Sequence, residues 1–391
     1  MRVLLVTPHY PPRAGNGGVP VVVRALARGL AAAGHAVAIL TDDTGGARPD
    51  DLPDVDVVVL PPAVRVRAGA ISPGAARFAA GHLGAFDVVH LFGTYHALGA
   101  AMAGHCVRRG IPYVIEPSGM LPPSGRSRMA KRIFLRLRGR RALAAAAAVV
   151  ATGPGERDAL AAMGVGADRL HVRRLGVEPD PSPAGVQPGR FRARLGVPDG
   201  ALLVLYMGRL ATIKGPDLLV GAFAGVHGHA HLALAGPHED ARLVRRLRDQ
   251  VAAAGLGSRV HMTGAVHGVT RAEALADADV FVLPSRSDCF GLAAAEAVAA
   301  GIPVLVSAAA GVARYVEGRA GLVAEPTVAG LQAGLERLLG DDALRQRLRD
   351  GCAAVAAGLT WDAPVAEMVA LYETIAATAR ADGAQSAGLG A

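Results

Sequence analysis

The sequence predicts an α/β protein made of two doubly wound domains, and two observations carry this prediction. Short apolar runs alternate with stretches of helical spacing, a pattern typical of parallel sheets that are covered by helices on both faces. The alternation is lost near residue 180, where Pro and Gly gather, and then starts again. Ligands bind such sheets at the carboxyl ends of their strands, so we expect a cleft between the two domains.

The first domain is expected over residues 1–178 and begins with a βαβ unit. Residues 3–7 form a continuous apolar run, 21–33 carry apolar residues at helical spacing, and 36–40 form a second apolar run. Continuous runs of this kind indicate buried parallel strands. Further strands are expected at 55–60, 88–91, 113–116 and 148–151.

The second domain, expected over 179–360, repeats the alternation. Strands are expected at 202–207, 232–235, 260–263, 280–283 and 304–306. Helices are expected at about 216–226, 239–255, 271–277, 291–300, 328–339 and 341–357. A last helix is expected within 361–380, packed back on the first domain, and the Gly, Ala and Ser of 381–391 predict a disordered tail.

Composition excludes several classes of protein. Apolar residues make up 51% of the chain and charged residues 19%, which permits a sizeable core and excludes global disorder. The three cysteines form no CxxC pair, so we expect no disulfide scaffold, no metal site and a reducing, cytoplasmic location. We expect no transmembrane helix and no leader segment. The net charge is +8, but only 4% of residues are aromatic, so we expect no nucleic-acid partner.

Two loops combine glycine with groups that could hold an anion. Loop 8–18 ends in Gly-Asn-Gly-Gly before a helix, and this favours approach of a phosphate to the backbone; the alternative is a turn needed only for chain reversal. The loop lacks GxGxxG, which argues against a nicotinamide dehydrogenase. In loop 208–215, Arg209 and Lys214 could converge on one anion, although this loop alone would favour ordinary surface charges.

Segment 284–297 is the most specific part of the sequence. Asp288 and Glu296 are eight residues apart, which places the first in a loop and the second inside the following helix. Free N–H groups at the start of that helix could hold a diphosphate while the two carboxylates bind hydroxyls on either side. The alternative is a helix capped by Asp288, with Glu296 in solvent.

This segment resembles the Glu-x7-Glu signature of the retaining glycosyltransferases of family 4, which have the GT-B fold of two Rossmann-like domains facing across a cleft. Asp288 stands in place of the first Glu of the signature. The shared residues are Pro284-Ser285, Phe290-Gly291, Glu296-Ala297, Ala299, Gly301 and Pro303-Val304. Gly208-Arg209-Leu210 with Lys214-Gly215, and Gly17-Gly18 followed by Gly34-His35, are similar to further family motifs, and the resemblance spans about residues 1–375.

The resemblance implies a retaining, metal-independent hexosyltransferase that moves a sugar from a nucleotide-sugar to an acceptor hydroxyl and needs no other cofactor. A UDP-sugar is the favoured donor and a GDP-sugar the second. A small secondary metabolite is the favoured acceptor, and a polysaccharide or glycolipid pathway is the alternative. A non-catalytic accessory protein that binds sugar nucleotides is a third interpretation.

The resemblance also implies roles for individual residues. Arg209 and Lys214 would neutralise the leaving diphosphate, and Asp288 would contact the donor sugar. Glu296 would hold the ribose, and Met262 and Thr263 would border the nucleobase. The other donor-binding residues would be Gly17, Gly18, Gly208 and, through their backbone, Cys289, Phe290, Gly291 and Leu292.

The run 115–121 resembles a family motif written P-H-G-M-L, but Ser118 replaces the His that acts at the donor sugar. Serine can form hydrogen bonds but cannot carry a positive charge. The candidates for contact with the acceptor or the sugar are His9, Asn16, His96 and Ser118.

Residues 126–141 hold eight basic side chains, with Met129, Ile133 and Leu137 at i, i+4 and i+8. We favour a solvated helix face here. The other interpretation is a weak contact with an anionic membrane surface.

Overall fold

The computed structural model describes residues 1–11, 18–42, 52, 54–60, 64–66, 69–123, 128–178, 185–238 and 240–388. The chain divides into two compact units. Unit 1 comprises Met1–Gly176 and Trp361–Ala391, and unit 2 comprises Val177–Thr360. The division after Gly176 falls close to the loss of periodicity in the sequence.

A seven-stranded parallel sheet, in the order β3-β2-β1-β6-β7-β8-β9, forms the centre of unit 1. Its strands are β1 (Arg2–Val6), β2 (Ala36–Thr41), β3 (Val55–Val59), β6 (Val88–Phe92), β7 (Tyr113–Glu116), β8 (Ala148–Ala151) and β9 (Leu170–Val172). The strand order reverses between β1 and β6, which makes the loops after these two strands the switch point of the sheet. The sequence did not predict β9, because this short edge strand has no continuous buried apolar run.

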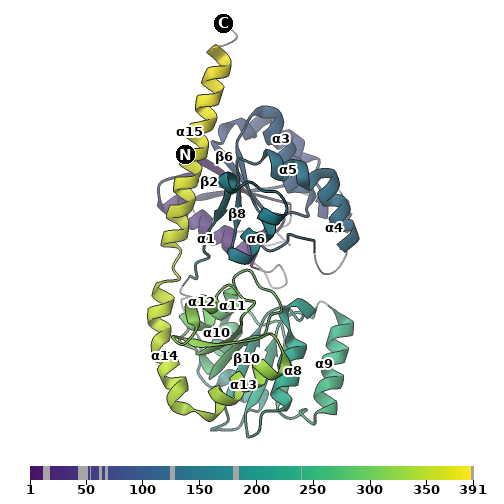
Figure 1. The fold of residues 1–391 in the computed structure, drawn as a ribbon, viewed down its shortest axis with the longest axis vertical. Coiled ribbons are helices and arrows are strands. Elements are labelled where there is room, and N and C mark those ends of the chain that lie inside the picture. The colour runs from purple at the N-terminus through teal and green to yellow at the C-terminus, as the bar shows by residue number, and fades with distance from the viewer. Residues whose placement is uncertain are drawn as a thin grey trace. The chain divides into compact units, whose positions relative to one another are not determined.

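Helices cover both faces of this sheet (Figure 1). They are α1 (Val19–Ala32), α2 (Gly74–His82), α3 (Ala97–Arg109), α4 (Arg128–Phe134), α5 (Arg140–Ala145) and α6 (Pro154–Ala162). A π-helical turn, Leu135–Gly139, joins α4 to α5, and β4 (Val64–Val66) pairs antiparallel with β5 (Gly69–Ile71). Side chains of α2, α3, α5 and α6 share one core with Leu4 and Val6 of β1.

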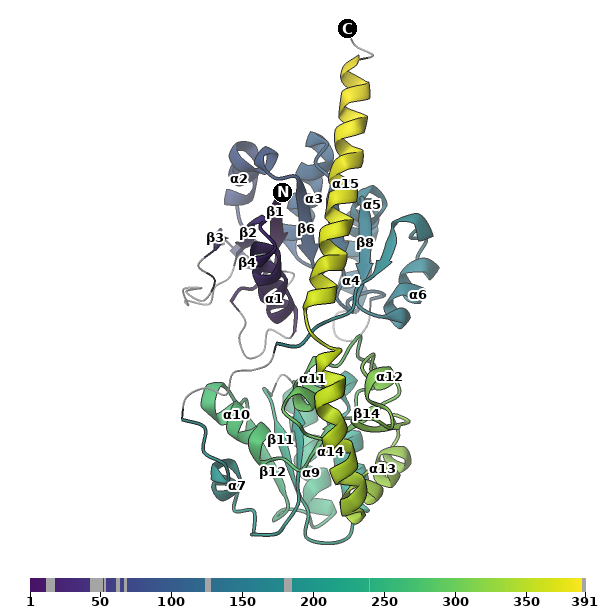
Figure 2. The same cartoon turned by 90° about the vertical axis from the view of Figure 1, so that its left-hand side faces the viewer.

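The last helix, α15 (Asp362–Gly388), packs against α1 in unit 1 (Figure 2). Gly29 of α1 lies so close to α15 that a Cβ atom on it would be 2.3 Å from Cγ2 of Val365. The sequence predicts a disordered tail over 381–391, whereas α15 runs on to Gly388 in the structure; residues 389–391 lie outside the described residues. Extending an existing helix through alanine-rich sequence costs little, because the unfavourable nucleation step has already been made.

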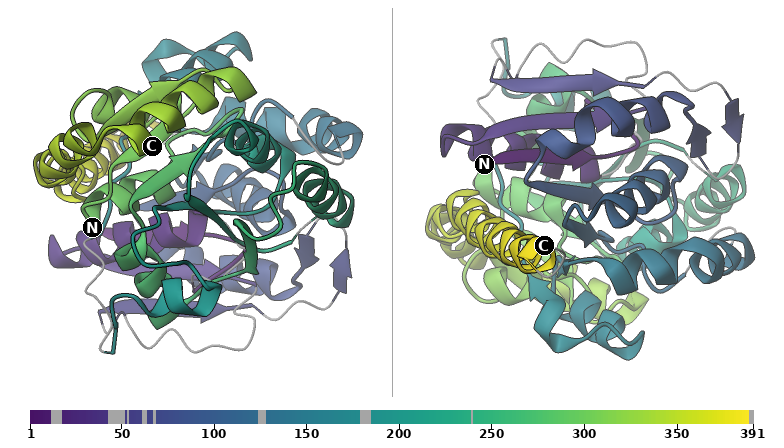
Figure 3. Two further views of the ribbon diagram at one scale, coloured as in Figure 1. Left: turned by 90° about the horizontal axis from the view of Figure 1, so that it is seen from below. Right: turned by 90° about the horizontal axis from the view of Figure 1, so that it is seen from above.

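Unit 2 contains a six-stranded parallel sheet in the order β12-β11-β10-β13-β14-β15, and Figure 3 shows both sheets flanked by helices. Its strands are β10 (Leu203–Met207), β11 (His231–Ala235), β12 (Val260–Gly264), β13 (Val280–Leu283), β14 (Val304–Ser307) and β15 (Gly321–Ala324). Its helices are α7 (Arg190–Leu195), α8 (Pro216–Ala224), α9 (Ala241–Ala253), α10 (Gly268–Asp277), α11 (Leu292–Ala299), α12 (Ala313–Val316), α13 (Val328–Gly340) and α14 (Asp342–Ala357). The order reverses between β10 and β13, so the loops after these strands flank the switch point.

By length and composition alone, the helical stretch Asp342–Asp382 could cross a membrane. Most of its large apolar side chains are buried in the protein, however. Leu344 and Leu348 belong to the core of unit 2, while Met368 and Tyr372 are buried in unit 1. Packing in the two units therefore accounts for the hydrophobicity of this stretch.

Candidate active site

Two loops meet at the switch point of unit 2, one after β10 and one after β13, and Arg286 joins them. Its backbone N–H donates to the carbonyl of Ile213 at 2.9 Å, and its guanidinium donates to the carbonyl of Thr212 at 2.7 Å. The same guanidinium forms a bidentate ion pair with Asp217, at 2.8 and 2.6 Å. This pair lowers the pKa of Asp217 and raises that of Arg286. The two loops are therefore fixed to each other before any ligand binds.

Lys214 and Asp288 form an ion pair between the same two loops. The Nζ atom of Lys214 lies 2.6 Å from Oδ2 of Asp288, and their side chains are 25% and 13% exposed. The hydroxyl of Ser285 also donates to this Oδ2, at 3.4 Å, and the Ser285 carbonyl accepts from Ser307 at 2.5 Å. A carboxylate thus holds the ammonium group in a defined position while leaving part of it accessible to an anion.

Arg209 stands at the start of the loop after β10. The hydroxyl of Tyr206, a buried residue of β10, donates to the Arg209 carbonyl at 2.7 Å. Burial raises the pKa of Tyr206, and the charges of Arg209 and Asp288 act on the same hydroxyl in opposite directions. Tyr206 therefore holds the backbone at Arg209 in place, and the meeting of the Arg209 side chain with Lys214 and Asp288 remains a prediction.

Glycine allows the backbones of these loops to touch. Gly215 has φ +68°, and a Cβ atom on it would lie 2.1 Å from the carbonyl oxygen of Pro284. A Cβ atom on Gly236, after β11, would lie 1.7 Å from the carbonyl oxygen of Gly208. A side chain at either position would collide with backbone that cannot move alone.

Replacing Gly236 by alanine should therefore disturb the loop after β10. We expect a loss of about 1–3 kcal/mol in the free energy of unfolding, because the added methyl group overpacks the loop. Chemical denaturation measures this loss. Gly257→Ala is the control, since a Cβ atom there meets nothing within 4 Å. Equal stability of the two variants would contradict the close approach at Gly236.

Gly291, which has φ +96°, is the N-cap residue of helix α11, and within the described residues no side chain caps this end. Asp288 does not act as the cap: its N–H donates to the Ala309 carbonyl, and its carboxylate binds Lys214 instead. The open N-terminus leaves the positive end of the helix available to an anion. Phe290 turns its ring into the core near Tyr315, so it can serve a ligand only through its backbone.

Glu296, inside α11, is not the solvated residue of the alternative interpretation. Its Oε2 atom forms an ion pair with Arg271 of α10 at 2.8 Å, and both side chains are about one-quarter exposed. A ribose that binds Glu296 would therefore also meet Arg271, which the sequence did not single out.

Met262 and Thr263 line a pocket of about 400 Å³ beside β12. Side chains of α7 and α10, among them Phe191 and Thr270, complete its wall. The charged residues of the two loops are not part of this lining. The assignment of Met262 and Thr263 to the nucleobase remains a prediction.

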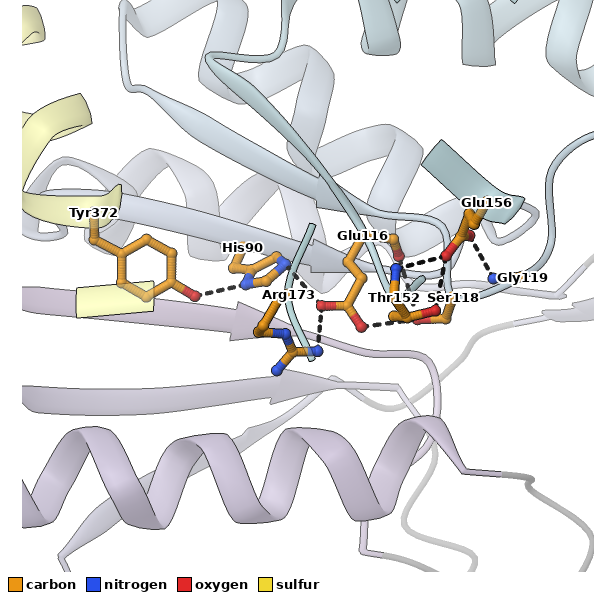
Figure 4. Close-up of polar contacts among 8 residues, drawn as sticks. All are labelled: His90, Glu116, Ser118, Gly119, Thr152, Glu156, Arg173 and Tyr372. Atoms are coloured by element: carbon orange, nitrogen blue, oxygen red, sulfur yellow. Dashed lines mark hydrogen bonds and ion pairs between the residues drawn. The ribbon is translucent and has the colours of Figure 1, made fainter. Parts of the chain in front are cut away.

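In unit 1, the carboxyl ends of the strands carry a buried polar network (Figure 4). Glu116 at the end of β7 accepts a hydrogen bond from Nη2 of Arg173 at 2.6 Å, and both side chains are 1% exposed. Nδ1 of His90 and the hydroxyl of Tyr372 are 2.6 Å apart, which links this network to α15. The sequence did not predict the network, because its members are up to 282 residues apart.

Burial sets the charges in this network. It raises the pKa of Glu116, while the guanidinium of Arg173 and the hydroxyl of Ser118 act in the opposite direction. Burial and the charge of Arg173 lower the pKa of His90 well below its usual value, so this histidine is neutral near pH 7. The contact of 3.7 Å between His90 and Glu116 is therefore no ion pair at that pH.

Ser118 and Gly119 form a left-handed turn that two carboxylates hold in place. Ser118 has φ +53°, a rare conformation for a residue with a side chain, and its hydroxyl donates to Oε1 of Glu116 at 3.2 Å. The Gly119 N–H donates to Glu156 at 2.6 Å, and Glu156 also accepts from Thr152. Such strained turns gather at functional sites, which agrees with a ligand contact at Ser118.

Comparison with known proteins places the chain in a family. The family described as "Glycosyl transferase 4-like domain" matches residues 17–176, and "Glycosyl transferases group 1" matches 189–352. A D-inositol 3-phosphate glycosyltransferase of Catenulispora acidiphila is 31% identical over 402 residues, which cover 95% of this chain and 94% of that protein. The chain belongs to family 4 of the glycosyltransferases. As a glycosyltransferase, it is an enzyme that transfers a sugar.

Solved structures confirm the predicted GT-B fold of this glycosyltransferase. Sucrose-phosphate synthase from Thermosynechococcus elongatus superposes with a TM-score of 0.76 at 25% identity, covering 96% of this chain and 99% of that one. HepE from Anabaena, solved in complex with UDP and glucose, has a TM-score of 0.77 at 19% identity, with the same coverage.

The remaining predicted residues of this glycosyltransferase lie in unit 1. His96 caps α3: its Nδ1 accepts from Gly99 at 3.0 Å and its Nε2 pairs with the Phe92 carbonyl at 2.9 Å, so both ring nitrogens are engaged. Burial lowers its pKa to about 4, and His9 is near enough to contribute. Gly18 precedes α1. Asn16 and Gly17 lie outside the described residues.

Proposed function

We propose that this glycosyltransferase moves a sugar from a nucleotide-sugar, with a UDP-sugar favoured, to an acceptor hydroxyl with retention of the anomeric configuration. The observation that carries the proposal is the Lys214 ammonium, held 2.6 Å from Asp288 at the switch point of unit 2. This is where a doubly wound sheet binds its ligand.

Breaking the bond between the sugar and the diphosphate is the step that this site would assist. As the bond breaks, negative charge gathers on the departing diphosphate and positive charge on the sugar ring. Lys214 and Arg209 offset the first of these charges, and the N-terminus of α11 adds N–H donors. We assign to these groups the charge compensation that a divalent metal supplies in other phosphoryl sites.

Asp288 and Glu296 would orient the donor. Once Lys214 binds the diphosphate, the Asp288 carboxylate can accept hydrogen bonds from the sugar, and Ser285 still steadies it. Aspartate is one methylene shorter than the glutamate of the family signature, so the sugar must lie nearer to the loop after β13. Glu296, with Arg271 beside it, would bind the ribose.

The configuration at the anomeric carbon is retained if the acceptor attacks this carbon on the face from which the diphosphate leaves. The bond between the anomeric carbon and the phosphate oxygen breaks, and the acceptor oxygen bonds to that carbon. The acceptor proton passes to the departing phosphate oxygen. This step needs no covalent enzyme nucleophile, and the turn at Ser118 would contact the acceptor or the sugar.

The choice of substrates rests on the named relatives. HepE was solved with UDP and glucose, and two relatives whose matches cover 95% of this chain are named as D-inositol 3-phosphate glycosyltransferases. We therefore propose a UDP-sugar as donor and a small polyol phosphate as the first acceptor to test. We propose a cytoplasmic location, because the three cysteines of the sequence are widely spaced and form no CxxC pair.

Thermal unfolding with UDP, GDP, ADP and dTDP tests the donor site. We expect UDP to raise Tm. At a concentration one hundred times its Kd, UDP should add about 2.7 kcal/mol to the free energy of unfolding. The matching nucleotide-sugar is then incubated with D-inositol 3-phosphate, and the anomer of the product is read by NMR. A product of inverted configuration would contradict the mechanism. If no nucleotide shifts Tm, a lost donor site is supported instead. A Tm shift without turnover of the nucleotide-sugar would support the non-catalytic interpretation.

A further inference from the structure

The outer side of the segment from α4 to α5 carries an exposed apolar stripe. Met129, Ile133 and Leu137 are 65%, 53% and 65% exposed, and they follow one another at helical spacing. The other large apolar side chains exposed in the described residues stand singly on separate elements. We call this side of residues 128–141 the basic face, because arginines border the stripe.

The segment of chain that carries the basic face contains no acidic residue. The exposed arginines of the face are Arg128, Arg132, Arg136, Arg138, Arg140 and Arg141. The sequence contains no Asp or Glu between Glu116 and Glu156, and both of these are buried and bonded elsewhere. Repulsion among these arginines would be relieved by an anionic partner.

The inner side of the segment fixes the stripe in its outward direction. Leu135 and Leu143 are buried in the core of unit 1. The rings of Phe134 and Tyr95 pack edge-on, with their centroids 6.0 Å apart. The ammonium of Lys131 lies 5.5 Å from the centroid of the Tyr95 ring. The apolar stripe is therefore not a core face that a small rotation of the helix would bury.

We propose that the basic face docks on an anionic lipid bilayer. Met129, Ile133 and Leu137 would enter the boundary between headgroups and acyl chains, while the arginines bind lipid phosphates. A nucleic acid would satisfy the arginines but leave the apolar stripe in water. This inference is independent of the proposed function, because docking needs neither donor nor acceptor.

Co-sedimentation of the full chain with lipid vesicles tests the proposal. We expect binding to vesicles that contain phosphatidylglycerol, and at least tenfold weaker binding to pure phosphatidylcholine. Met129→Ser/Ile133→Ser/Leu137→Ser should weaken binding about tenfold or more, because the buried apolar area is lost. Arg132→Ser/Arg136→Ser/Arg140→Ser should weaken it about a hundredfold at physiological salt, from about 1 kcal/mol for each arginine.

Two variants serve as matched controls. Arg242→Ser/Arg245→Ser/Arg246→Ser removes the same charge from α9, whose apolar residues, such as Leu243 and Leu247, are buried. Val107→Ser removes an exposed apolar side chain, 55% exposed, from α3. Both should bind vesicles like the wild type, and all variants should keep their turnover with soluble substrates.

Three results would overturn the proposal: equal binding to neutral and anionic vesicles, wild-type binding by the stripe variant, or an equal loss in the α9 control. Duplex DNA is a further competitor. The face would be assigned to nucleic acid instead if DNA displaced the vesicles and if the stripe variant bound DNA as tightly as the wild type does.

Discussion

Replacing Lys214 by alanine should lower kcat about 10²–10³-fold while the protein stays folded, the size of effect seen when one preorganised charge-stabilising group is removed. The loss should fall on kcat more than on the donor KM, because charge on the diphosphate grows as the glycosyl bond breaks. Steady-state kinetics with the donor identified by thermal unfolding measures both constants.

Two further variants separate the charge of Lys214 from its contact with Asp288. Lys214→Arg keeps the charge but changes its shape, so it should retain more activity than the alanine variant. Asp288→Asn, alone and with Lys214→Ala, gives a double-mutant cycle for the 2.6 Å pair. Turnover of Lys214→Ala close to that of the wild type would refute the assignment of this lysine to the diphosphate.

Replacing Arg173 by methionine should destabilise unit 1 by about 3–5 kcal/mol, because the buried carboxylate of Glu116 would lose its partner. Arg173 is fully buried, and its guanidinium also lies 5.5 Å from the ring of Trp361. For a unit of this size, the loss corresponds to a fall in Tm of roughly 6–20 °C. Differential scanning calorimetry measures it.

The neighbouring residue provides the control. Arg174 forms an ion pair with Glu367 in which both side chains are 42% exposed, so Arg174→Met should change stability by about 0.5 kcal/mol or less. Adding Glu116→Gln to Arg173→Met should restore part of the lost stability, since the unpaired buried charge is then gone. A loss no larger in Arg173→Met than in Arg174→Met would contradict the buried pair.

The repeated α/β pattern and the positions of the candidate loops could be predicted from the amino-acid sequence. Parallel strands that are buried on both faces are continuous apolar runs. The strands β1, β10 and β13 can therefore be predicted from their own residues. Lys214 and Asp288 lie in the loops that follow β10 and β13, and the spacing of Asp288 and Glu296 is a local property as well. Such features require no knowledge of which strands become neighbours.

The tertiary structure alone decided which of these groups meet. The order of the strands brings Arg286 to Asp217, Arg271 to Glu296 and Arg173 to Glu116, and apolar runs do not encode that order. An isolated charge in a sequence is most often solvated, so the members of these pairs other than Glu296 were indistinguishable from surface residues. Burial and ion pairing arise only in the folded chain. A charge that is removed from water there is costly unless an opposite charge lies beside it.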